Sequence, residues 1–552
     1  NKMKRDLALK ASEKIGENRD LPLYTANIGN VYYLQGDYYT AIEYLNKSIK
    51  LIENSRLSVL RAIKRDYLSN LIGIYKILCS AYIKNNNLDI AFNLSEQFRA
   101  KYLKEEIELK MNKDNIKFND LNDYSKNIDN NTIILNYMMY GINKMYIFIK
   151  DKNILTVEQI DENILRNLIE TYNLSEKNYT ANTKKSNISS LRQNTSKDID
   201  KIVAYYRDLI TIEKDNTQDN TVLKNISHDI YKLLIKKAEP YIKGKKNLII
   251  IPDGTLGYLP FETLLDSNNK YLIEKYNINY TYSLTINQLI TERQKKYSNN
   301  RKPFIGFGDP VYEKDITNID EATDNSNIIQ TANYYIENNM NLREIYRRLK
   351  INNWGDLPFS EEMIEEISKI IGKGDIYTKE DVKESFIKKL SEEKNLRNYK
   401  VIHFATHGVA ISDIPELSTL VLSQFNENKN EDGYLTMNEI TNLDIEADFV
   451  NLSACESGLG KIYGGEGVVG LGQSFIYAGA NSVVVSLWSV NDLATKDFMV
   501  EVYKLVKEEK IEYGEAINEV KRKFIDGEIK SPSGGFYYTN PYYWAAFVYY
   551  GK

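Results

Sequence analysis

The chain has 552 residues, of which 42% are hydrophobic and 27% charged, as is typical of a globular protein with more than one domain. A formal net charge of −4 leaves no excess of positive charge for nucleic acid or for an anionic membrane surface. With only two cysteines and three histidines, the sequence argues against a disulfide framework and a zinc site. We therefore expect a cytoplasmic protein in a reducing compartment, without a metal or organic cofactor.

Residues 1–115 predict helices, because apolar and small residues recur three and four positions apart. Residues 24–53 fit the tetratricopeptide repeat, and a plain helical hairpin array is the alternative. The residues that fit the repeat pattern are Gly29, Tyr32, Gly36, Tyr38, Ala41 and Leu45. The segment before them resembles the second helix of a preceding repeat whose first helix is missing, so we expect an N-terminal truncation or a processed product.

From about residue 130 the pattern changes to strands. Residues 131–150 alternate and are rich in Ile and Tyr, which predicts a hairpin, and NLIII at 247–251 predicts a buried strand. Residues 174–200 are polar and predict a loop or connector.

The last part of the chain alternates short apolar strands with helices, which favours a parallel sheet covered on both faces. We expect strands at 303–308, 400–407, 448–455 and 481–488 and helices at 361–371, 380–396, 466–478 and 492–508. Polar insertions at about 313–345 and 424–432 predict surface loops.

Two of the predicted strands end in residues suited to nucleophilic catalysis. His407 ends KVIHFATH and Cys455 ends DFVNLSAC, 48 residues later (455 minus 407). Reacting groups of open α/β sheets gather at the carboxyl ends of strands, where an imidazole can take the proton of a thiol. The N–H groups of Gly408 and Cys455 would then form an oxyanion hole. The alternative for Cys455 is an inert thiol of the core.

The runs VIHFATHG and VNLSACESGLGKIYGGEGVVGLGQSFIYAGANSVVVSLWSVND resemble the CHAT family of peptidases, which are relatives of caspases and separases and are often fused to tetratricopeptide repeats. Further matching runs are IPDGTLGYLPFETLL, FIGFGDPVY, LPFSEEMIEEI and NPYYWAAFVYYG. The resemblance implies an α/β caspase-like sheet covered by helices on both faces, preceded by an all-α region of repeats. It divides the chain into repeats at 1–115, a connector and degenerate half-domain without the dyad at 116–300, and a catalytic half at 301–552.

Other residues near the predicted site have two interpretations each. Asp492, in a run similar to the LWxVxD of separases, would select Arg or Lys in the substrate, or would cap the helix that follows it. Glu456 and Ser457 would line the substrate pocket. His403 is a second base or, as we favour, a hydrogen-bonded residue beneath the site. The run GEGVVG at 465–470 fits a dinucleotide motif but favours close packing of a helix on the sheet.

The resemblance implies a cysteine endopeptidase that cleaves a protein substrate, is regulated by a partner and acts in bacterial defence or cell-death signalling, for example with CRISPR effectors. A regulatory protein or ribonucleoprotein would bind the repeat region, without direct contact of this chain with nucleic acid or membrane. One alternative is a non-catalytic repeat scaffold with a pseudo-protease domain. Another is a zymogen whose dyad aligns only when a partner docks.

Overall fold

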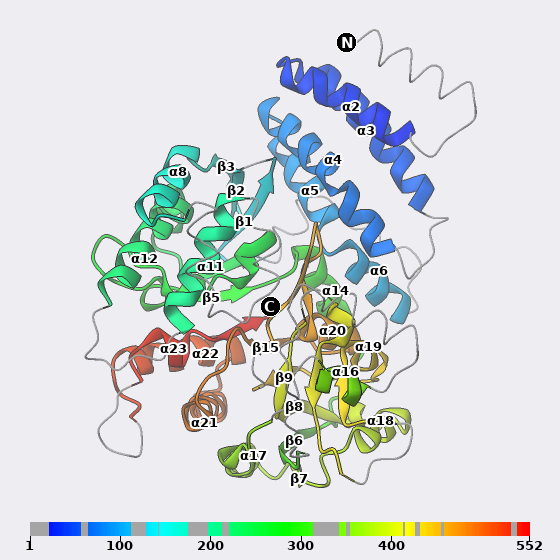
Figure 1. Cartoon of the computed structure of the whole chain (residues 1–552), viewed down its shortest axis with the longest axis vertical. Coiled ribbons are helices and arrows are strands. Elements are labelled where there is room, and N and C mark those ends of the chain that lie inside the picture. Colours follow the sequence, from blue (N-terminus) through cyan, green and yellow to red (C-terminus); the bar gives the residue numbers. More distant parts are fainter. Residues whose placement is uncertain are drawn as a thin grey trace.

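In the computed structural model, the chain consists of a helical region followed by a large sheet with helices on both faces (Figure 1). Residues 454–456, which include Cys455 and Glu456, lie outside the part that the structure describes, as do residues 313–341 and most of the loop at 174–200. The end of the loop predicted at about 313–345 is wrong, because residues 342–345 begin helix α16 (Leu342–Arg348) and Ile345 packs in a buried apolar cluster. The described residues are 21–56, 64–111, 128–141, 143–174, 197–211, 220–312, 342–348, 354–411, 414–425, 431–453, 457–530 and 538–551.

The helical region confirms the expected helices between residues 21 and 110. Its helices are α2 (Leu21–Leu34), α3 (Tyr38–Arg56), α4 (Lys64–Lys84), α5 (Leu88–Phe98) and α6 (Lys101–Lys110). Gly29 lets α2 and α3 approach, since a Cβ on it would lie 2.7 Å from Cγ of Leu45. Gly36 turns the chain with a φ of +82°. The helical hairpin at 24–53 is therefore present, and its assignment to the tetratricopeptide repeat stays a prediction.

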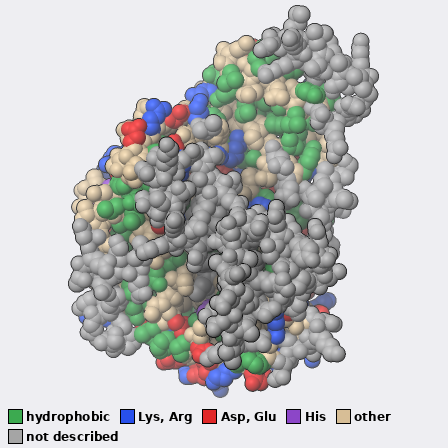
Figure 2. Space-filling model, in the orientation of Figure 1, with side chains coloured by type: hydrophobic (Ala, Val, Ile, Leu, Met, Phe, Trp, Pro, Cys, Tyr) green, Lys and Arg blue, Asp and Glu red, His purple; other side chains and the backbone are tan. Residues whose placement is uncertain are grey.

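Hydrophobic side chains gather on the outer surface of these helices (Figure 2). Leu34 is 75% exposed and Tyr39 is 76% exposed, with Leu23 and Tyr24 also exposed. Apolar side chains of this size, grouped on two neighbouring helices, suit contact with another protein segment.

Eleven strands of the described residues form one sheet in the order β3-β2-β1-β4-β5-β16-β15-β12-β8-β6-β7. Strands β1, β4, β5 and β16 are parallel, and so are β15, β12, β8, β6 and β7, and the two groups meet at the antiparallel pair β15–β16. The strands are β1 (Thr132–Tyr140), β2 (Lys144–Lys150), β3 (Leu155–Gln159), β4 (Asn247–Ile251), β5 (Asn277–Tyr280), β6 (Lys302–Pro310), β7 (Asp375–Lys379), β8 (Tyr399–Ala405), β12 (Phe449–Leu452), β15 (Val483–Ser486) and β16 (Phe547–Tyr550).

Helices cover both faces of this sheet, as the sequence predicts. Successive residues of a strand point to opposite faces. In β8 the ring of His403 stacks on Tyr503 of α21 and that of Phe404 packs on Phe475 of α20. The remaining helices are α8 (Glu162–Thr171), α11 (Asp198–Thr211), α12 (Thr221–Leu234), α13 (Glu239–Ile242), α14 (Leu284–Gln294), α16 (Leu342–Arg348), α17 (Pro358–Ile371), α18 (Glu384–Glu392), α19 (Met437–Asn442), α20 (Leu471–Ala478), α21 (Asp492–Glu508), α22 (Tyr513–Ile525) and α23 (Pro541–Trp544).

Two smaller sheets flank the strand ends, and one of them corrects the sequence prediction. The helix predicted at 466–478 begins only at Leu471, because the preceding residues form the hairpin of β13 (Gly460–Tyr463) and β14 (Gly467–Gly470). Glycine disfavours helix and permits close strand contact: a Cβ on Gly470 would lie 2.4 Å from the carbonyl oxygen of Leu459. The other sheet joins β9 (His407–Val409), β10 (Thr419–Val421) and β11 (Tyr434–Thr436).

No helix within the described ranges is both long and apolar enough to cross a membrane. The prediction that the chain has no membrane contact goes further than this observation and stays a prediction.

A buried ion pair links α22 to the segment between β4 and β5. Nζ of Lys521 on α22 lies 2.5 Å from Oε1 of Glu262, and the two side chains are 2% and 0% exposed. The hydroxyl of Tyr280 donates a hydrogen bond to the same carboxylate. We expect Lys521→Met to lower the free energy of unfolding by about 3–5 kcal/mol in urea denaturation, because it leaves a buried carboxylate without its cation.

The matched control is Lys232→Met on α12, where the lysine is 62% exposed and pairs with Asp229. A solvated pair of this kind contributes less than about 1 kcal/mol. Equal losses of stability in the two variants would contradict the assignment of the Lys521–Glu262 pair as a structural link.

Candidate active site

The two strands that carry the predicted dyad lie side by side. Strand β12 pairs in parallel with β8, with Val450 opposite Ile402 and Leu452 opposite Phe404. The pairing continues past β12, where the N–H of Ser453 donates to the carbonyl of Phe404 over 3.0 Å. Both strands therefore end at the same edge of the sheet, as predicted. His407 does not end β8, which stops at Ala405, but begins β9 two residues later.

Cys455 itself is not described, but the residues on either side of its segment are fixed. Ser457 Oγ donates to the carbonyl of Leu452 over 3.2 Å and accepts from the N–H of Ser486 over 2.9 Å. The N–H of Gly458 donates to the carbonyl of Ser486 over 2.7 Å. The described residues on both sides of 454–456 are thus bonded at the ends of β8, β12 and β15.

A backbone carbonyl fixes the imidazole of His407. Its Nε2 lies 2.7 Å from the carbonyl oxygen of Gly355. A carbonyl oxygen only accepts hydrogen bonds, so Nε2 carries the proton, and in the neutral ring Nδ1 is left with the lone pair. The rings of Tyr312 and Trp354 flank the imidazole, with centroids 5.1 and 5.5 Å away. The geometry therefore suits His407 to accept a proton through Nδ1.

The strand register shows which way the backbone N–H of Gly408 points. Between β10 and β11, the N–H of Leu422 donates to the carbonyl of Gly433, and the N–H of Met437 donates to the carbonyl of Ser418. Hydrogen-bonded pairs alternate along an antiparallel ladder, so Leu420 and Leu435 between them also form a hydrogen-bonded pair. Leu420 therefore turns its N–H and C=O toward β11. Gly408 lies opposite Leu420 on β9, so its own N–H points away from β10.

His403 is fully buried and hydrogen-bonded, as we favoured from the sequence. Its Nε2 lies 3.0 Å from Oγ of Ser453, and its Nδ1 lies 3.3 Å from the hydroxyl of Tyr503. Burial lowers the pKa of His403 to about 3, so the ring is neutral at physiological pH. It supports the strand end from which the nucleophile segment departs.

Asp492 does not cap the helix that it begins. Asn491 caps α21 through a hydrogen bond from the N–H of Ala494 over 3.2 Å. The carboxylate of Asp492 instead accepts the N–H of Phe359, in the first turn of α17, over 2.9 Å. Burial raises the pKa of Asp492 and the hydrogen bond from Phe359 opposes it. Asp492 is half-buried, which is compatible with either capping α17 alone or also binding a basic side chain.

The segment 354–359 connects these groups, and sequence reasoning missed it. The ring of Trp354 packs on that of His407, and the carbonyl of Gly355 accepts the hydrogen bond from its Nε2. The N–H of Phe359 donates to the carboxylate of Asp492. The resemblance covered only the part that begins at Leu357. A backbone carbonyl leaves no signature in a residue type, so only the spatial arrangement identifies Gly355.

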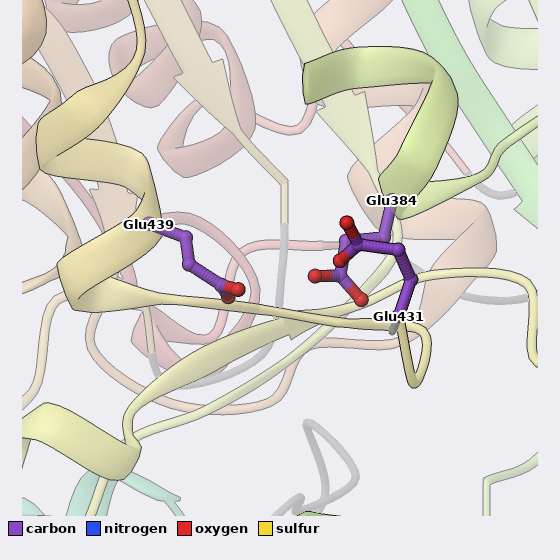
Figure 3. Close-up of side chains that lie close together, drawn as sticks. All are labelled: Glu384, Glu431 and Glu439. Carbon is purple, nitrogen blue, oxygen red and sulfur yellow. The ribbon is translucent and has the colours of Figure 1, made fainter. Parts of the chain in front are cut away.

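Two further groups of residues do not belong to this site. Figure 3 shows the carboxylates of Glu384, Glu431 and Glu439 facing one another. Nζ of Lys388 lies 2.6 Å from an oxygen of each, so an ammonium already supplies the positive charge that they need. A cavity of about 450 Å³ lies between α6, α19 and α20 and is lined by neither His407 nor Asp492.

The chain belongs to the CHAT domain family, whose model matches residues 224–552, more than half of the sequence. It is therefore a member of the caspase-like peptidase family that its motifs indicate. This match begins within the predicted half-domain at 116–300, and the predicted domain limits themselves stay predictions. No curated protein matches the sequence.

Several solved structures are similar to the chain. The separase of Saccharomyces cerevisiae in its complex with securin has a TM-score of 0.46 and 12% identity, and the match covers 93% of this chain. This chain spans only 37% of that separase chain. The Arg-specific cysteine proteinase gingipain R has a TM-score of 0.34 and 9% identity, covering 64% of this chain and 73% of that one. The pro- and mature domains of Porphyromonas gingivalis RgpB give a TM-score of 0.34 and 8% identity, covering 64% and 75%.

The pH dependence of peptide cleavage tests the role of His407. Burial lowers its pKa, and the hydrogen bond to Gly355 only partly opposes this. Protonated His407 cannot accept a proton, so kcat/KM falls as the pH drops through the folded-state pKa. We expect the midpoint of the acid limb to lie below about pH 6.5, the usual value for histidine.

His228→Gln is the control, since His228 lies on α12 and bonds the carbonyl of Leu265. The control should show the wild-type midpoint. An acid limb centred above the usual histidine value would contradict the described environment of His407.

Proposed function

We propose that the protein is a cysteine endopeptidase in which Cys455 is the nucleophile and His407 the general base. The observation that carries the proposal is the hydrogen bond from Nε2 of His407 to Gly355. A nucleophile needs a base, and the base needs a third group that fixes its tautomer and orientation. Gly355 supplies that third group here, beside the strand end that precedes Cys455.

In the proposed reaction Nδ1 of His407 takes the thiol proton of Cys455, and the thiolate attacks the carbonyl carbon of the scissile peptide bond. The N–H groups of Gly408 and Cys455 hold the negative charge that forms on the carbonyl oxygen. The carbonyl of Gly355 stabilises the imidazolium. His407 then gives its proton to the leaving amine, a thioester remains on Cys455, and a water molecule deprotonated by Nδ1 hydrolyses it.

We further propose that the site prefers Arg or Lys before the cleaved bond, with Asp492 as the residue that selects it. The carboxylate belongs to the first residue of α21, six residues after β15 ends at Ser486, the residue to which Ser457 of the nucleophile segment is bonded. One oxygen accepts the N–H of Phe359, and a second oxygen is present on the same group to face a cation. Glu456 and Ser457 would line the same pocket.

The helical region is proposed to bind the regulator or the substrate, as tetratricopeptide repeats do, in a cytoplasmic defence or cell-death pathway that includes CRISPR effectors. The exposed Leu34 and Tyr39 on its outer surface favour a protein partner. Under the alternative of a non-catalytic scaffold, the same surface would bind partners but Cys455 would have no function.

Substitution of the nucleophile separates these two functions. We expect Cys455→Ala to lower kcat/KM on a cleaved protein substrate at least about 10³-fold, because no other group forms the thioester. The control is Cys79→Ala, since Cys79 lies on α4 and is fully buried. Turnover that survives Cys455→Ala would contradict the proposal, and mass spectrometry of proteins retained by that variant would identify the substrate.

Substitution of Asp492 tests the preference for a basic residue. Asp492→Asn removes the charge but keeps an oxygen for the N–H of Phe359, so α17 stays capped. We expect kcat/KM to fall about 10–100-fold on Arg and Lys peptides, which lose a charge-assisted hydrogen bond, and to stay the same on uncharged peptides. Asp497→Asn, on the same helix but bonded to Tyr538, is the control. A cleavage profile without basic preference in the wild type would sink the assignment.

A further inference from the structure

The hairpin β13–β14 connects the nucleophile segment to the helical region. Strand β13 begins at Gly460, five residues after Cys455 (460 minus 455), and pairs with β14 from Gly460–Gly470 to Tyr463–Gly467. In Figure 1 the orange strands reach from the body of the sheet toward the blue helices. The tip of the hairpin is formed by residues 464–466, which overlap the first two residues of the run GEGVVG at 465–470.

The tip contacts α4 and the residues that join α5 to α6. The N–H of Gly464 donates to Oγ of Ser69 over 3.0 Å, and the carbonyl of Gly465 accepts the N–H of Ala100 over 2.7 Å. A Cβ on either glycine would lie 2.6 Å from a side-chain carbon of Ile72. The two glycines therefore permit the close approach of the tip to α4.

Glu466 locks the tip to the first turn of α6. Its Oε1 accepts the N–H of Tyr102 over 2.7 Å, its Oε2 lies 3.4 Å from the N–H of Leu103, and the residue is 3% exposed. The residue that precedes α6, Ala100, has no side chain that could cap it and has a φ of +45°. A carboxylate from another part of the chain thus satisfies N–H groups that α6 cannot satisfy itself.

The base of the hairpin is fixed as firmly as its tip. The hydroxyl of Tyr258 donates to the carbonyl of Gly460, and Gly458 is bonded to Ser486 at the end of β15. Fewer than ten residues therefore separate the lock at Glu466 from Ser457, the described end of the nucleophile segment. Glu466 and α6 therefore hold the chain within ten residues of the segment that carries the thiol.

We propose that Glu466 is a positioning residue for Cys455, because it holds the hairpin that follows the nucleophile against α6. The inference rests on the proposed function where it calls Cys455 the nucleophile. The positioning of the Cys455 thiol by Glu466 does not depend on that function. The inference also assigns a route by which a protein bound to the helical region acts on the site, from α6 through Glu466 and the hairpin to the described residues 457–460 that follow the nucleophile.

The test measures the rate at which the Cys455 thiol is alkylated, which requires no substrate. Iodoacetamide should alkylate Cys455 alone in the folded protein, because Cys79 is fully buried and burial raises the pKa of its thiol. We expect Glu466→Ala to slow alkylation of Cys455 about fivefold or more, since loss of a helix cap frees the hairpin. Glu466→Gln, which keeps one acceptor oxygen, should recover part of the rate.

Hydrogen–deuterium exchange supplies a second readout that does not depend on thiol reactivity. Exchange of peptides within 451–463 should accelerate in Glu466→Ala. The matched control is Asp161→Ala, which removes a carboxylate cap from α8 through the N–H of Asn163, far from the hairpin. The control should leave both the alkylation rate and the exchange of 451–463 unchanged.

Wild-type alkylation and wild-type exchange in Glu466→Ala would overturn the inference, as would faster alkylation of Cys455. The protein could instead show no peptidase activity while Glu466→Ala still alters the alkylation rate and the exchange. That result would refute the proposed function but support the positioning of Cys455 by Glu466. The two failures are therefore distinguishable.

Discussion

The parallel pairing of β8 with β12 is the constraint on which the site depends. It fixes Phe404 opposite Leu452 and carries on to the hydrogen bond between Ser453 and Phe404. A slip by one residue would exchange the faces of His403 and Phe404, which pack on helices of opposite sides. The register that satisfies the core therefore also sets which residues leave the two strands at the edge where the dyad is proposed.

Backbone groups position the side chains of the proposed site. Gly355 orients the imidazole of His407, Gly408 turns its N–H away from β10, and Phe359 binds the carboxylate of Asp492. Such groups are held in place by helices and strands and need no specific side chain. Gly355 and Phe359 lie four residues apart, just before α17 and in its first turn, so the base and the proposed specificity residue are positioned by one short segment.

The sequence predicted the parts of the fold that periodicity controls. The apolar strands around His403 and Val450, the hairpin at 131–150 and the helix α21 lie where the pattern placed them. It could not show that residues 467–470 form a strand, because that strand depends on contacts across the hairpin and at its tip. Gly470 approaches Leu459, just before the facing strand, and Gly464 and Gly465 approach Ile72 of α4, which is distant in the sequence. Nor could it show that Asp492 binds α17, since helix capping by a residue 133 positions away leaves no local pattern.

The helical region is tied to the sheet by polar contacts in addition to apolar packing. Lys76 of α4 pairs with the buried Asp253, and Glu96 of α5 accepts the N–H of Leu284 at the start of α14. Glu466 makes the reverse contact, from the catalytic half to α6. Such contacts are directional, so they fix the orientation of the helices relative to the site more closely than an apolar interface would.

The most direct test of the central claim is the mass of the protein after reaction with a peptidyl acyloxymethyl ketone that ends in arginine. Such a ketone forms a thioether with a thiolate held beside a protonated or protonatable base. Peptide mapping should place one adduct on Cys455 in the wild type and none in His407→Ala. An adduct on Cys79, or an equal yield on Cys455 with and without His407, would contradict the proposed dyad.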